Sequence, residues 1–165
     1  YQAFFGRYIT FFLIGQAQTL ITVLGDLFYI RIQCHNPFLF WLAAAISSLV
    51  FTLLIYALTV AFGNVGEALA IIVMVIQVAG AGGTFPIETL PEVYRSVYKY
   101  LPFPYGMNAM RETIGGMYGM DYWNDIGMLG IYIVIALFIG LVLAIPFRKL
   151  NRIIEKSKEN TGIMI

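Results

Sequence analysis

The most regular feature of this sequence is a series of long apolar runs separated by shorter polar stretches. Four of the runs approach the roughly 20 residues that a helix needs to cross a bilayer. They cover about residues 8–30, 38–62, 65–82 and 126–147. None alternates apolar with polar positions as the strands of a transmembrane barrel do. Because unpaired backbone groups are costly in hydrocarbon, the pattern predicts an all-α, polytopic transmembrane helical bundle with four spanning helices.

A polar, proline-containing segment, residues 84–123, separates the third run from the fourth. Two short amphipathic helices fit within it: one over 91–100 that Pro102 ends, and one over 104–114 that Gly115 caps. Neither is long or apolar enough to span a membrane. Tyrosines on both would lie at the depth of the lipid head groups. We therefore expect two interfacial or re-entrant helices on the outer side.

The stretch GAGGTFPIETLP (80–91) joins the third run to this outer segment. Its glycines permit a turn or close packing, Pro86 stops the helix, and Pro91 begins the next one. On the second outer helix, Arg111 and Glu112 are either surface charges or anchors, one to a lipid phosphate and one to the protein. We expect an outer hinge and re-entrant motif, whose candidate residues are Gly80, Gly82, Gly83, Pro86, Glu88, Pro91, Pro102, Asn108, Arg111, Glu112, Gly115 and Gly116.

Composition agrees with a membrane protein and excludes several functions. Hydrophobic residues make up 60% of the 165 residues and charged residues 12%, whereas a soluble domain has about 25% charged residues. One cysteine and one histidine exclude an internal disulfide and a metal site built on cysteine or paired histidines. The phosphate-binding pattern GxxxxGK[ST] is missing from the sequence. We expect no catalytic residues, no cofactor and no nucleic-acid partner.

The distribution of basic residues predicts the orientation in a bacterial plasma membrane. The tail, residues 148–165, holds half of the ten Lys and Arg residues: Arg148, Lys149, Arg152, Lys156 and Lys158. Positive residues favour the cytoplasmic side, so the basic tail is expected there. With four spans the start of the chain is cytoplasmic too. The loop 31–37, with Cys34, and the segment 84–123 then face outward.

A few polar side chains interrupt the apolar runs. Asp26 is the one charge well within a span, where a carboxylate is costly unless it faces a partner or water. It is either an interfacial carboxylate, solvated or paired with an arginine, or a group lining a polar path. Gln16, Gln18 and Gln77 are uncharged, and we expect them to form interhelical hydrogen bonds.

Three stretches carry a resemblance to a known family: FGNVGEALAII (62–72), GAGGTFPIETLP (80–91) and LPFPYGMNAMRETIGG (101–116). On these, the chain resembles the C-terminal membrane domain of the YhgE/Pip, or phage infection protein, family. That domain is in turn similar to the permeases of type 2 ABC transporters. The resemblance implies a six-span fold of which residues 1–165 form the last four spans as a single permease-like domain.

The resemblance also implies a function and partners. Such permeases work as homo- or heterodimers in membrane lipid with a separate ATPase, and the expected substrate is hydrophobic, lipid-like or a polypeptide. The alternative is a non-transporting membrane anchor of a cell-surface protein, such as a phage receptor or a component of a type VII-like secretion machine.

Overall fold

The structure is a computed structural model, and it describes residues 2–80, 91–117 and 119–145. All the regular elements in this part of the chain are helices, so the all-α prediction is confirmed there. Two are short π-helical turns that continue an α-helix. In chain order the elements are α1 (Gln2–Leu24), η1 (Gly25–Tyr29), α2 (Pro37–Phe62), α3 (Asn64–Gly80), α4 (Glu92–Tyr98), α5 (Pro102–Gly115), α6 (Asp121–Phe138) and η3 (Ile139–Leu143).

Three helices in the described residues are long and apolar enough to cross a membrane: Gln2–Tyr29, Pro37–Phe62 and Asp121–Leu143. The fourth predicted span corresponds to α3, which has 17 residues. That length is about 25 Å of helix, somewhat less than the roughly 30 Å hydrocarbon core of a bilayer. Residues 81–90, which follow α3, lie outside the described residues, so the count of four spans stays a prediction.

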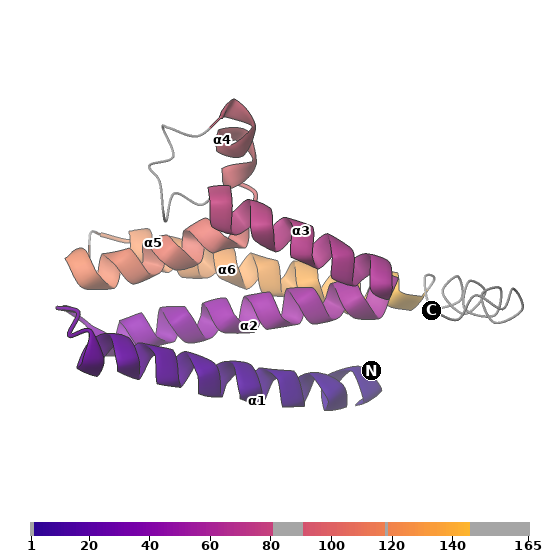
Figure 1. Cartoon of the computed structure of the whole chain (residues 1–165), viewed down its shortest axis with the longest axis horizontal. Coiled ribbons are helices and arrows are strands. Elements are labelled where there is room, and N and C mark those ends of the chain that lie inside the picture. The colour runs from indigo at the N-terminus through magenta and orange to yellow at the C-terminus, as the bar shows by residue number, and fades with distance from the viewer. Residues whose placement is uncertain (1, 81–90, 118, 146–165) are drawn as a thin grey trace, which may run out of the picture.

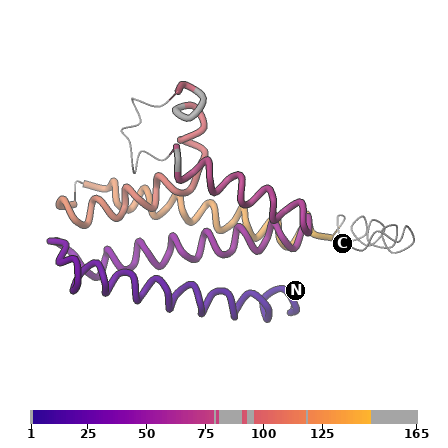
Figure 2. The backbone as a smooth tube through the Cα atoms, in the orientation of Figure 1, coloured from indigo at the N-terminus to yellow at the C-terminus, as the bar shows by residue number. Residues whose placement is uncertain are grey.

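Helix α2 is the central element of the bundle, because it packs against α1, α3, α5 and α6. Figure 1 shows α1 along one side of α2, with α5, α6 and α3 on the other side. In the backbone trace of Figure 2, α3 starts beside the end of α2 and then diverges from it toward α4. The two sides of α2 therefore have different neighbours.

The largest buried cluster joins the first, central and last helices. It consists of Phe4, Tyr8, Leu53, Ala57 and Ala136. Aromatic rings from α1 meet small residues of α2 and α6 there, so the helices approach closely. The Tyr56 hydroxyl on α2 also donates a hydrogen bond to the Phe4 carbonyl at 3.0 Å. The start of α1 is thereby fixed beside the second half of α2.

Two details of the predicted outer helices are wrong. Pro102 does not end a helix but is the first residue of α5, where its fixed φ suits a helix and its missing N–H costs nothing. The left-handed glycine after this helix is Gly116 (φ 99°) and not Gly115, which is still helical. The helix continues one residue beyond the predicted 114, so the position that needs glycine's conformational freedom shifts by one.

Candidate functional site

The first turn of α5 carries two buried residues, Pro102 and Pro104. Even so, almost none of its backbone N–H groups is left without a hydrogen-bond partner. The first four N–H groups of a helix lack partners within it. Here Leu101 donates to the Tyr98 carbonyl at 3.3 Å, and the two prolines have no N–H to satisfy. The remaining group, the Phe103 N–H, donates to Oε1 of Gln77 at 3.3 Å. This helix start can therefore lie away from water at little cost.

Gln77 is 1% exposed and comes from α3, so its hydrogen bond to Phe103 links α3 to the start of α5. The same end of α5 lies level with the middle of α2, since the rings of Phe103 and Phe51 are 5.9 Å apart. Phe51 is about 21 Å along the helix from Pro37 at 1.5 Å per residue. Helix α5 thus begins halfway along the bundle.

The other end of α5 is held by the loop between η1 and α2. The Thr113 carbonyl accepts hydrogen bonds from the N–H groups of His35 (3.0 Å) and Asn36 (3.3 Å) and from Sγ of Cys34 (3.3 Å). Carbonyls in the last turn of a helix have no partner within it, and this loop supplies the donors. Helix α5 therefore runs antiparallel to α2 along its first half and ends level with its first residue.

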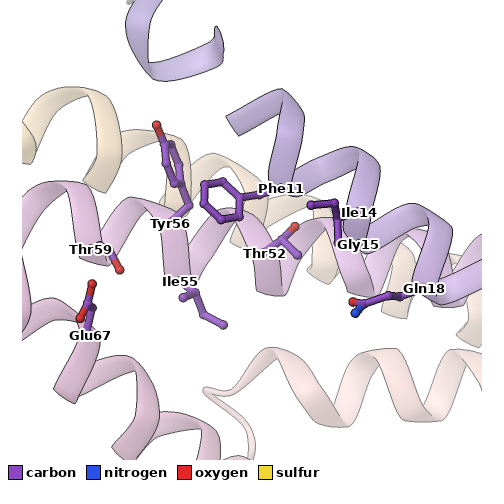
Figure 3. A pocket seen from close by; sticks show the side chains of 9 residues that line it. All are labelled: Phe11, Ile14, Gly15, Gln18, Thr52, Ile55, Tyr56, Thr59 and Glu67. Atoms are coloured by element: carbon purple, nitrogen blue, oxygen red, sulfur yellow. The ribbon is translucent and has the colours of Figure 1, made fainter. Parts of the chain in front are cut away.

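On the face of α2 opposite α6 lies a trough of two adjoining cavities, which share Gly15, Gln18 and Thr52. The first cavity has a volume of about 410 Å³ and reaches Glu67 on α3. In Figure 3 the Glu67 carboxylate points toward the Thr59 hydroxyl, and Gln18 lies at the other end of this cavity. The trough has α2 as its floor and α1 as one wall.

The second cavity, of about 300 Å³, continues the trough to Asp26 in η1 and to Met110 of α5. Asp26 is half-buried, so its carboxylate borders the cavity without being sealed from the surroundings. Gln16, one residue from the shared wall, donates from Nε2 to the Ala45 carbonyl of α2 at 3.1 Å. Gln16 thus binds α2, whereas Gln18, Thr19 and Thr22 of α1 border the trough.

Comparison with known proteins identifies the family. Residues 1–142 match the family described as ABC-2 family transporter protein. The chain belongs to this family. It therefore lies in a membrane, in agreement with the three long apolar helices found among the described residues.

Two curated relatives match the chain. It is 33% identical over 160 residues, or 96% of its length, to the uncharacterized protein YhgE of Bacillus subtilis (strain 168), and it spans 20% of that protein. It is 32% identical over 63 residues to Nodulation protein J of Rhizobium leguminosarum bv. trifolii, which covers 38% of the chain and 24% of that protein. The resemblance to YhgE and to ABC-2 permeases is thereby confirmed. No solved structure gives a significant match.

The structure describes only part of the predicted hinge of this ABC-2 family member. Gly80 is buried at the end of α3, and Pro91 precedes α4 at an exposed position. The other candidates of the hinge lie outside the described residues: Gly82, Gly83, Pro86 and Glu88. The basic tail, residues 148–165, also lies outside them.

The candidates of the second outer helix all lie on α5 or directly after it. Asn108 and Glu112 are half-buried, whereas Arg111 and Gly115 are exposed. Gly116 follows the helix with positive φ. Asn108 lies in the middle of α5, whereas the other four lie toward its end or directly after it, remote from Gln77.

Sequence reasoning missed the contact that seats α5 on α2. A Cβ added to Gly106 would collide with Oγ of Ser47. Ser47 is itself buried and donates to the Ala43 carbonyl at 2.8 Å. Ser47 lies on an apolar run and Gly106 on a short polar helix. Nothing in either pattern indicates that the two residues meet.

Proposed function

We propose that this chain forms part of a permease of the ABC-2 type, which exports a hydrophobic, lipid-like or polypeptide substrate with a separate ATPase subunit. Family membership over residues 1–142 is the observation that carries the proposal. Because the chain spans only 20% of YhgE, activity, substrate and partners of the whole protein are part of the proposal.

In this proposal α5 is the outward-running helix of a re-entrant segment: it starts near the middle of the membrane and ends at the outer side, and α6 then crosses the membrane. The start of α5 lies beside the middle of α2, where Phe51 and Phe103 meet. An unpaired N–H in hydrocarbon costs several kcal/mol, and the two prolines and Gln77 remove that cost. A helix that lay at the membrane surface would not need this arrangement, since water would satisfy its first turn.

The proposal also fixes the orientation of the bundle. The loop 31–36 and the end of α5 form the outer end, and the beginnings of α1 and α3 form the cytoplasmic end. Helix α3 is then the third of four spans, and both ends of the chain are cytoplasmic. A dimer of such domains would provide two copies of α5 at the outer surface.

The function is tested with the purified protein and candidate ATPases that carry the phosphate-binding pattern GxxxxGK[ST], reconstituted together in proteoliposomes. We expect ATP hydrolysis to rise when both are present and a fluorescent lipid to cross the bilayer only with ATP. The control is the same ATPase with its phosphate-binding lysine replaced by alanine. If the folded protein binds no ATPase and ATP drives no movement, the permease proposal fails and the membrane-anchor alternative is favoured.

A further inference from the structure

We propose that the trough along α2 binds the head group of an amphiphilic primary amine. The inference deepens the proposed permease function, and rests on it only for the idea that the bound molecule is moved. The trough extends from Glu67 on α3 to Asp26 in η1, with Gln18 and Thr52 shared by its two cavities. It therefore passes along most of the length of α2.

The hydroxyl groups that line the trough mostly direct their protons into the helix backbone. Thr19 donates to Gly15 (2.9 Å), and Thr22 donates to Gln18 (2.9 Å). Thr52 on α2 donates to the Ser48 carbonyl at 2.8 Å. A hydroxyl has one proton and two lone pairs, so these oxygens keep lone pairs that can accept a hydrogen bond. The Thr52 oxygen also lies 3.2 Å from the Tyr8 hydroxyl. The polar surface of the trough is thus rich in hydrogen-bond acceptors.

The charges of the trough have one sign. Asp26 and Glu67 line its two ends, and no Lys or Arg is among the described residues that line either cavity. Asp26 belongs to the candidate span Gln2–Tyr29, and a carboxylate in a span pairs with another group or faces a cavity. A cationic group bound at either end of the trough would give the carboxylate at that end a partner.

Among simple head groups, an ammonium fits this surface better than an alcohol or an anion. An ammonium has three donors and no acceptor, so each of its N–H groups finds a lone pair or a carboxylate. An alcohol also needs a donor, and a sulfate or phosphate needs several. The Gln18 amide supplies two N–H groups, which is too few for an anion in a trough whose charged lining residues, among those described, are both carboxylates.

The apolar part of the lining suits an alkyl chain. Phe11, Ile14 and Ile55 border the first cavity together with its polar groups. The volume of about 410 Å³ falls in the range of roughly 300–1,000 Å³ for ligand pockets. Asp26 also lies in a π-helical turn, an element frequent at functional sites. Head and tail of one amphiphile would thus contact neighbouring parts of the same trough.

The proposal is tested by equilibrium binding of tritiated dodecylamine to the protein in phosphatidylcholine nanodiscs, with empty nanodiscs to subtract partition into lipid. We expect saturable binding that dodecylamine displaces and dodecyl sulfate does not, with dodecanol much weaker. The double variant Asp26→Asn/Glu67→Gln should weaken binding at least about tenfold, which is about 1.4 kcal/mol.

Two further variants separate the trough from general effects of charge and folding. Glu92→Gln neutralises an exposed carboxylate on α4, outside the trough, and should bind the amine as the parent does. A triple variant removes hydroxyl oxygens from the lining while nearly keeping the shape of the side chains: Thr22→Val/Ser48→Ala/Thr59→Val. It should weaken binding of the amine severalfold. The proposal would be overturned if dodecyl sulfate displaced tritiated dodecylamine as well as dodecylamine does. It would also be overturned if the double variant bound the amine as tightly as the unchanged protein.

The assay contains neither ATP nor ATPase, so it is independent of the transport experiment. Amine binding that the double variant weakens, without ATP-driven transport, would leave the site standing and refute the permease. ATP-driven transport without such binding would leave the permease standing and refute the site.

Discussion

The contact between Gly106 and Ser47 makes the arrangement of α5 on α2 testable with a single methyl group. Gly106 is buried on α5, and an added Cβ would collide with Ser47 Oγ and lie 3.3 Å from Ser47 Cβ. We expect Gly106→Ala to destabilise the protein. The neighbouring backbones belong to two helices packed along their length, so neither can move away without loss of other contacts.

The size of this destabilisation follows from the two ways in which the structure can accommodate the added methyl group. If the Ser47 hydroxyl rotates away, it loses its hydrogen bond to the Ala43 carbonyl, worth about 0.5–1.5 kcal/mol. If the helices separate instead, overpacking costs about 1–3 kcal/mol. Alanine also favours a helix over glycine by up to about 1 kcal/mol, so the variant must be compared with another glycine-to-alanine change.

Gly127 on α6 provides that comparison, because a Cβ added there meets nothing within 4 Å. Thermal unfolding in detergent should rank Gly106→Ala about 1–3 kcal/mol below Gly127→Ala. Adding Ser47→Ala removes the colliding oxygen and should restore much of the loss. The proposed contact between Gly106 and Ser47 is refuted if Gly106→Ala is as stable as Gly127→Ala. It is also refuted if adding Ser47→Ala lowers the stability of Gly106→Ala further.

Three other predictions concern the start of α5, a hydrogen bond between α6 and α2, and the loop between η1 and α2. Gln77→Leu leaves the part-buried Phe103 N–H without its acceptor and should lower the free energy of unfolding by about 1–3 kcal/mol, measured by denaturant titration. Tyr122→Phe removes the 2.9 Å bond from a buried hydroxyl to the Leu39 carbonyl and should cost about 0.5–1.5 kcal/mol in the same titration. Cys34, the single cysteine, should react with a membrane-impermeant maleimide in intact cells.

Matched variants decide the outcome of these tests. Gln18→Leu changes an exposed glutamine and serves as the control. If it lowers the free energy of unfolding as much as Gln77→Leu does, the hydrogen bond from Phe103 to Gln77 does not have the stabilising role assigned to it. For Tyr122→Phe, an unchanged midpoint would show that the hydroxyl does not stabilise the fold. Gln33→Cys in a Cys34→Ala background places the thiol at an exposed position of the same loop. Labelling of that variant only in permeabilised cells would reverse the orientation.

Much of the fold could be predicted from the sequence, because the length of an apolar run and the positions of prolines act locally. The run expected at 38–62 is α2, Pro37–Phe62, since the solvent for such a run is lipid and a helix pairs its own backbone. The two short helices after the third run were also expected. The sequence prediction began the second of these helices at Pro104, whereas α5 begins at Pro102, because both prolines are compatible with a first turn.

The sequence by itself determined which segments are helical and which of them suit a membrane. Only the tertiary structure decided that Gln77 meets the Phe103 N–H, that Gly106 faces Ser47, and that Asp26 and Glu67 border one trough. The physical reason is that helix formation depends on neighbours within a few residues, whereas these contacts join residues far apart in the chain. They depend on the rotation of each helix about its axis, which packing against α2 selects.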